Sequence, residues 1–208
     1  MNTVVVRTGI VIILGLAFFT TYGQSDQEAT NEINDHRKKQ QQEMRDRNES
    51  PLSKKDRRHF KGLNYYPIDL SYRVKAKFIK TENPVLFKMK TTTARLPEYS
   101  KYGEVHFDLN GQSYKLEVYH NSDIAKRPGY EDYLFIPFTD QTNGKETYEV
   151  GRYLDFRSPS AQEVTIDFNL AYNPYCSYSP NFSCPIPPEV NYLPVQVKAG
   201  EMKFKSGH

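Results

Sequence analysis

The residues best suited to chemistry lie in the second half of the chain, in FTDQTNGKETYEVGRYLDF at 138–156 and shortly after it. Carboxylates, amides, tyrosines and an arginine stand close together there. Arginine presents a planar fork of donors to a carboxylate or phosphate, and tyrosine provides an apolar wall with a polar tip. We therefore predict a small-ligand binding cluster. Its members are Asp140, Thr142, Asn143, Glu146, Tyr148, Arg152, Tyr153, Asp155, Asn169, Tyr172 and Asn173.

The same region allows carboxylate chemistry as an alternative. Asp140, Glu146, Asp155 and Asp167 could supply an acid–base pair or a calcium cage. Their spacing matches no EF-hand loop, and no G-x-S-x-G motif marks a nucleophilic serine. With no recognisable catalytic motif, whether the protein is an enzyme stays open, and we predict no metal and no cofactor. In a purely structural role, Arg152 would instead pair with a nearby carboxylate inside the fold.

A proline-rich loop, AYNPYCSYSPNFSCPIPPEVN at 171–191, contains both cysteines of the chain. In an exported protein a close pair of this kind usually forms a disulfide, so we predict a bond between Cys176 and Cys184. Metal binding would need further ligands, and the five histidines are scattered; a redox role would favour C-x-x-C spacing. We expect this loop to pack beside the turn at 140–155.

The elements that must position these residues are mostly β-strands. Residues 72–78 alternate strictly between apolar and basic, as a half-buried strand does. In 105–119, Asn110-Gly111 predicts a type I′ hairpin with Leu109 opposite Gln112. Further short strands are predicted at 133–138, 151–156, 163–170, 193–199 and 202–205. No long amphipathic helix interrupts them. The predicted fold is therefore mainly β, a compact antiparallel sandwich or barrel-like domain with a short N-terminal helical leader.

The N-terminus predicts export. Residues 1–23 contain Arg7, an uncharged apolar run at 8–19 and a small residue, Gly23, before a possible cleavage point, which are the parts of a secretory signal peptide. The apolar run is shorter than the ~20 residues that span a bilayer. We expect a chain that starts near Gln24, lies in the periplasm or outside the cell, and has no membrane span after cleavage.

Two segments follow the signal peptide. Residues 24–60 are polar and suit a helical leader with only Ile33 and Met44 as large apolar contacts, so we expect a solvated segment, with a partner-binding helix as the alternative. Residues 61–208 form a single β domain. Without Arg7 the net charge falls from +3 to +2, which gives no reason to expect nucleic acid as a partner.

Three segments resemble a known family: SPLSKKDRRHFKGLNYYPID, FTDQTNGKETYEVGRYLDF and IDFNLAYNPYCSYSPNFSCPIPPEVNYLPVQVKAGE. They are similar to the uncharacterised bacterial domain-of-unknown-function family 1684, with exported members, over roughly residues 50–205. The resemblance implies no activity. The positions that carry it are Asp140, Thr142, Gly144, Glu146, Tyr148, Gly151, Arg152, Tyr153, Asp167, Asn169, Tyr172, Asn173, Pro174, Cys176, Cys184 and Pro185.

Two functions follow as hypotheses. The first is an exported β domain that binds a small molecule or a cell-envelope component. The alternative is an envelope hydrolase that uses a pair of carboxylates. Geometry separates them, because two carboxylates and Arg152 converging in an open cleft would favour the enzyme. Pairing of Arg152 inside a closed core would make it scaffold.

Overall fold

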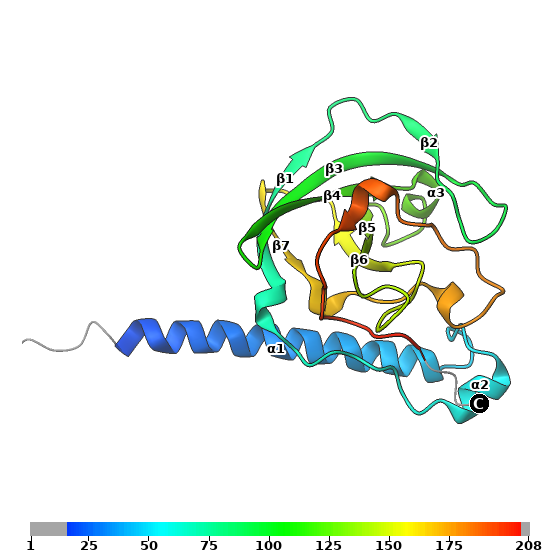
Figure 1. The fold of residues 1–208 in the computed structure, drawn as a ribbon, viewed down its shortest axis with the longest axis horizontal. Coiled ribbons are helices and arrows are strands. Elements are labelled where there is room, and N and C mark those ends of the chain that lie inside the picture. The colour runs from blue at the N-terminus through cyan, green and yellow to red at the C-terminus, as the bar shows by residue number, and fades with distance from the viewer. Residues whose placement is uncertain (1–15, 205–208) are drawn as a thin grey trace, which may run out of the picture.

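The computed structural model describes residues 16–204, which form a curled antiparallel sheet with a long helix packed along one side (Figure 1). The helices are α1 (Leu16–Arg45), α2 (Lys54–His59) and α3 (Ser122–Ala125). The strands are β1 (Arg73–Lys80), β2 (Leu86–Lys88), β3 (Glu98–Leu109), β4 (Gln112–His120), β5 (Tyr133–Asp140), β6 (Arg152–Arg157), β7 (Glu163–Asp167) and β8 (Tyr192–Leu193). Short 3-10 turns lie at Leu70–Tyr72, Phe168–Leu170, Tyr175–Ser177 and Glu189–Asn191. The predicted mainly β, antiparallel class is confirmed.

The strand order is β6-β5-β4-β3-β1-β7, with β2 added to β3 and β8 added in parallel to β5. The hairpin between β3 and β4 has the predicted register, with Leu109 opposite Gln112 and Phe107 opposite Tyr114. Asn110 and Gly111 both have positive φ, at 53° and 76°, as a type I′ turn requires. Local turn chemistry therefore determines the longest ladder of the sheet.

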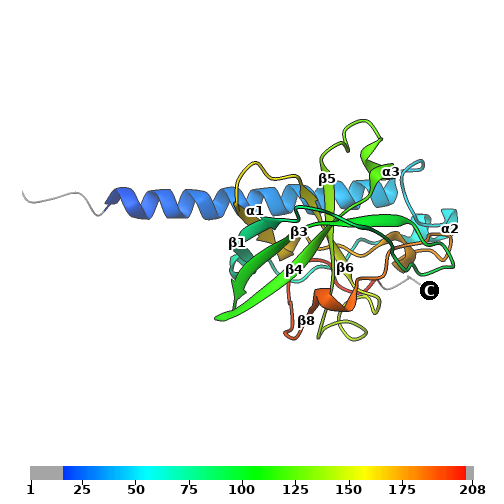
Figure 2. The same ribbon diagram turned by 90° about the horizontal axis from the view of Figure 1, so that it is seen from above.

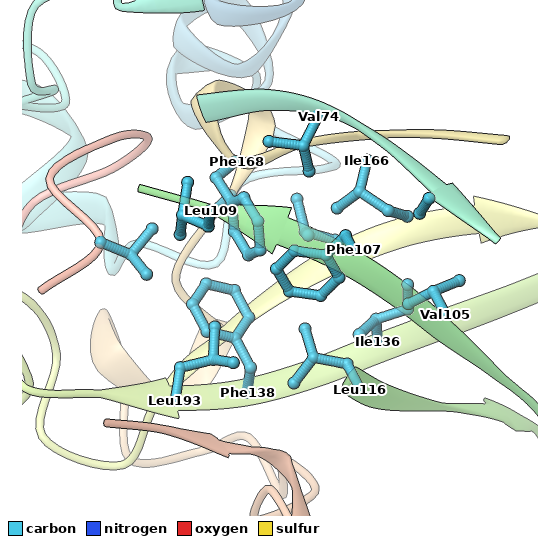
Figure 3. Close-up of a cluster of buried hydrophobic side chains, with 14 of the residues drawn as sticks. Val74, Val105, Phe107, Leu109, Leu116, Ile136, Phe138, Ile166, Phe168 and Leu193 are labelled. Carbon is cyan, nitrogen blue, oxygen red and sulfur yellow. The ribbon is translucent and has the colours of Figure 1, made fainter. Parts of the chain in front are cut away.

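The inner face of the sheet holds the main core (Figure 3). Val105, Leu116, Ile136, Phe138 and Phe168 are fully buried there. Ile136 and Phe138 are two positions apart on β5, as expected because side chains of a strand point to opposite faces with a period of two; Phe168 joins them from the 3-10 turn after β7. The opposite face of β5 and β6 therefore remains available for a second set of side chains.

Three predicted strands are shorter in the structure or do not form. The strand predicted at 163–170 ends at Asp167, whose side chain caps the following 3-10 turn by accepting a hydrogen bond from the Asn169 amide. Of the strand predicted at 193–199, only Leu193 is paired, in β8. No strand forms at 202–204, where the Lys203 amide bonds to the Glu146 carbonyl; residue 205 lies outside the described residues. A side-chain cap ends the first strand, whereas isolated backbone hydrogen bonds, such as that from the Gln141 amide to the Val195 carbonyl, replace a ladder in the other two segments.

Helix α1 begins before the expected leader, and one side of it is buried against the domain. It contains 30 residues and starts at Leu16, inside the predicted signal peptide; residues 1–15 of that peptide lie outside the described residues. Ile33 is fully buried and Met44 is only 6% exposed. The helix runs along the β domain and its N-terminal part extends beyond it (Figures 1 and 2). The expectation of a solvated leader is wrong for the part from Ile33 to Met44.

Polar contacts complete the docking of α1. The Gln41 side chain donates to the Leu63 carbonyl at 3.1 Å and accepts from the Leu63 amide at 3.0 Å. Arg37 donates to the Tyr66 carbonyl at 3.1 Å. The helix thus satisfies backbone groups of a segment that has few ladder partners, as buried peptide groups require. Within residues 16–204, the helices lack the combination of length and hydrophobicity needed to cross a membrane.

Candidate functional site

Arg152 lies at the centre of a closed ion pair. Its Nη2 is 2.8 Å from Asp140 Oδ2, and both side chains are fully buried. The same guanidinium donates to the carbonyls of Ala199 at 2.5 Å and Val197 at 2.8 Å. By the criterion given above, this pairing inside the core makes Arg152 and Asp140 scaffold rather than ligand-binding groups.

The neighbouring members of the predicted cluster hold the turn after β5. Asp140 Oδ1 accepts from the Thr142 amide at 2.7 Å, and Asn143 Oδ1 accepts from the Asp140 amide at 2.6 Å. The Thr142 and Thr147 hydroxyls are 2.8 Å apart. Asp, Asn and Thr side chains commonly form such local hydrogen bonds in turns. These three members of the predicted cluster therefore stabilise the turn.

Two further members also have structural partners. Asn169 exchanges two hydrogen bonds with the backbone of Asp69, at 3.1 and 2.9 Å, and so joins the turn after β7 to the segment before β1. Glu146 lies 3.8 Å from Lys198 in a half-exposed pair. Neither residue lies beside the cavity described below.

The predicted disulfide is not formed. Both cysteines of the chain lie in the described part, and Cys176 and Cys184 are free thiols. Their expected proximity is confirmed, but Cys184 Sγ accepts the Cys176 amide at 3.2 Å instead of bonding to sulfur. Hydrogen bonds from Cys184 and from the Tyr148 hydroxyl, which is 3.5 Å away, lower the pKa of Cys176 to about 6. The contact with Tyr148 confirms that the loop packs beside the 140–155 turn.

A second buried anchor, Glu201, is missed by the sequence patterns. Its Oε1 accepts from the Tyr178 hydroxyl at 2.6 Å and from the Asn173 side chain at 2.9 Å, and its Oε2 accepts from the Asn173 amide at 3.0 Å. Burial raises the pKa of Glu201 to about 7, although these hydrogen bonds oppose the shift. Glu201 thereby fixes the loop that carries both partners.

A cavity of about 1110 Å³ lies between α1, the outer face of β5 and β6, the segment around α3, and the 172–185 loop. Four of the predicted residues line it: Tyr153, Asp155, Tyr172 and Asn173. Most of its aromatic wall is missed by the sequence patterns: Tyr99, Tyr130, Tyr133, Phe135, Tyr175 and Tyr178. Helix α1 contributes His36, Gln40 and Met44.

The floor of the cavity is a row of aromatic rings on the outer face of the sheet. Ring centroids are 5.3 Å apart for Tyr99 and Phe135, 5.5 Å for Phe135 and Tyr153, and 5.9 Å for Tyr153 and Tyr172. These spacings lie in the favourable range for aromatic pairs. The sequence signal for the floor is YLFIPF in β5, where aromatic and aliphatic residues alternate and both faces are apolar.

Asp155 is the polar group of this floor. Its Oδ1 accepts from the Tyr172 hydroxyl at 2.7 Å and from the Tyr133 hydroxyl at 2.8 Å. Burial and the Asp155 charge raise the pKa of Tyr133, so this phenol keeps its proton and remains a donor. The two tyrosines hold the carboxylate in one orientation.

The carboxylates proposed for catalysis do not converge. Asp140 is paired with Arg152, and Asp167 lies 2.8 Å from Arg73. Of the four carboxylates considered, Asp155 alone lines the cavity. Across residues 16–204, no three His, Cys, Asp or Glu side chains gather in a way that could hold a metal ion. The geometry favours binding over acid–base chemistry by a carboxylate pair.

Comparison with known proteins places the β domain in a family. The family described as "Protein of unknown function (DUF1684)" matches residues 58–202. The solution NMR structure of an uncharacterised protein from Haloarcula marismortui is similar, with 34% sequence identity and a TM-score of 0.67. The similarity covers 86% of this chain and 96% of that one. No curated protein matches.

Loss of the buried guanidinium should strongly destabilise the fold. We expect Arg152→Ala to lower the free energy of unfolding by about 3–5 kcal/mol, because Asp140 would remain buried without its partner. Arg152→Lys should recover only part of this, since an ammonium cannot reproduce the fork of donors. Arg157→Ala, on the same strand in an exposed pair with Asp132, should cost about 1 kcal/mol or less. Urea melts measure all three, and a wild-type-like Arg152→Ala would contradict the scaffold role.

Glu201 should make stability depend on pH. Its folded pKa of about 7 lies above the ordinary value of 4.5, so its contribution is fully present below 4.5 and is lost as the pH rises through 7. The difference in unfolding free energy between wild type and Glu201→Gln should fall by roughly 3 kcal/mol over this window. Urea melts across the window measure it. Parallel pH profiles for the two proteins would show that Glu201 is not buried in the protonated form.

Proposed function

The chain belongs to the DUF1684 family, and we propose that it is a binding protein that holds a small organic molecule in the cavity between α1 and the sheet. The observation that carries the proposal is the cavity itself, with its row of aromatic rings and one oriented carboxylate. Ligand pockets are typically concave, several hundred to roughly 1,000 Å³ in volume, and mostly apolar with a few fixed polar groups. A cavity of about 1110 Å³ reaches the upper end of that range.

Tyr99, Phe135 and Tyr153 belong to a second buried cluster on the outer face of the sheet, separate from the main core. That core lies on the other face of the sheet and is closed by aliphatic residues and phenylalanines. Around the cavity, Tyr130 and Tyr175 are 44% and 43% exposed. Tyrosines that present a ring and a hydroxyl to an open space can contact a ligand at low entropic cost, because few torsions must be fixed.

We further propose that the protein is exported and meets its ligand outside the cytoplasm. The signal-like residues 1–23 support a protein whose ligand comes from the periplasm, the medium or the cell envelope. Cleavage before Gln24 would shorten α1 and leave the docked part from Ile33 onward. We expect the protein in the exported fraction to start near Gln24, as N-terminal sequencing would measure. An intact N-terminus on protein confined to the cytosol would contradict export.

A blocked cavity tests the binding function. Ile124 is a half-buried residue of α3 beside the cavity, and Ile124→Trp would fill part of it. We expect a thermal-shift screen of amines, carboxylates, sugars and nucleotides to find compounds that raise the melting temperature of wild type but not of Ile124→Trp. A ligand that binds only the folded state raises its melting temperature by mass action. When the cavity is filled by a side chain, the ligand cannot bind and this increase in melting temperature is lost.

The control places the same bulk elsewhere. Ile79 on β1 is 45% exposed and lies outside the cavity, so Ile79→Trp should respond to every compound as wild type does. A screen without any stabilising compound, or compounds that stabilise Ile124→Trp equally, would argue against the cavity as the binding site.

A further inference from the structure

The Asp155 carboxylate has one oxygen left for a ligand. Both of its hydrogen bonds, from Tyr133 and Tyr172, fall on Oδ1. Within residues 16–204, Asp155 Oδ2 has no hydrogen bond and no ion-pair partner. Asp155 itself is exposed toward the cavity that it lines. A carboxylate that only accepts hydrogen bonds offers a ligand an acceptor and a negative charge.

The other charged residues that line the cavity offset one another, and Arg157, whose charge interacts with Asp155, is paired with Asp132 at 2.6 Å. Lys39 and Glu43 lie 3.7 Å apart on α1 and offset each other. Burial lowers the pKa of His36, so this ring is mostly neutral at neutral pH. Arg127 and Glu49 add one charge of each sign. The cavity therefore retains a net negative charge, and that charge lies on its floor.

The surroundings of Asp155 suit a cation with an apolar body. The Tyr172 hydroxyl donates to Asp155, and the rings of Tyr172, Tyr153 and Phe135 follow one another in the row. Aromatic faces attract cations through their quadrupole and also cover apolar surface. An anion would meet the fixed carboxylate at the same place and would lose its hydration without a compensating donor there.

We propose, on the basis of the proposed binding function, that the ligand is a primary or secondary amine whose ammonium group donates a hydrogen bond to Asp155 Oδ2 while its apolar body lies on the aromatic floor. A quaternary ammonium has no N–H to donate and would use only the charge. Asp155 favours an amine over a neutral ligand because a positively charged N–H donor makes a stronger hydrogen bond to a carboxylate than a neutral donor does.

Three probes with one common body test this proposal. Phenethylamine, phenethyl alcohol and phenylpropionate carry a positive, a neutral and a negative group on the same phenylethyl chain. In calorimetric titrations of the full-length chain we expect phenethylamine to bind most tightly. Asp155→Asn should weaken its binding roughly tenfold to a hundredfold, the range expected for a hydrogen bond to a charged group, and should leave the alcohol unchanged.

Two variants serve as controls. Glu82→Gln removes an equal charge at an exposed position outside the cavity and should leave all three affinities unchanged. Asp155→Glu keeps the charge and should retain the preference for the amine over the alcohol. Melting temperatures establish that each variant is folded before it is titrated.

The outcomes separate this inference from the proposed function. The inference fails if the alcohol or the acid binds wild type as tightly as the amine, if Asp155→Asn binds the amine as wild type does, or if none of the probes binds. If the broader screen nevertheless finds neutral or anionic compounds whose effect Ile124→Trp abolishes, the cavity remains the binding site and only the choice of an amine is wrong.

Discussion

The pairing of Arg152 with Asp140 in the interior is the constraint on which the cavity-lining half of the molecule depends. The guanidinium has lost all contact with solvent, and it bonds to Asp140 and to the carbonyls of Val197 and Ala199. A buried pair of this kind adds little net stability compared with apolar packing, but any arrangement that leaves one member unpaired is costly. The pair therefore restricts how the C-terminal segment can lie on the sheet.

This restriction also affects the wall of the cavity, indirectly, through Glu201. The segment fixed by Arg152 continues to Glu201, which is fully buried and accepts hydrogen bonds from Asn173 and Tyr178. Tyr178 and Asn173 in turn line the cavity. Gly200 makes the close approach possible: its φ is 77°, and a Cβ there would lie 2.6 Å from the Ala171 carbonyl, so a side chain would be both strained and obstructed. The groups that position the wall are thus different from those that form it.

Local features of the fold could be predicted from the sequence, and the cavity largely could not. The Asn110-Gly111 hairpin depends on two turn residues and a strict alternation, so its register is readable. The proposed ligand cluster grouped Arg152 with Tyr153 because they are adjacent, but neighbours in a strand point to opposite faces. The docking of α1 escaped detection because much of it is made by polar side chains such as Gln41, which hydropathy does not register. The aromatic floor combines strands distant in sequence, and no single segment contains it.

The family match covers most of the cavity but not the wall that α1 provides. Residues 58–202 include the buried anchors and the floor with Asp155, whereas His36, Gln40 and Met44 on α1 lie before that range. The sheet and its loop therefore supply the carboxylate and the rings, and α1 supplies the opposite wall. Ile33 and the paired hydrogen bonds between Gln41 and Leu63 hold that wall in place. Enclosure of the cavity consequently depends on the helix as much as on the sheet, because without α1 the aromatic floor would be an open surface.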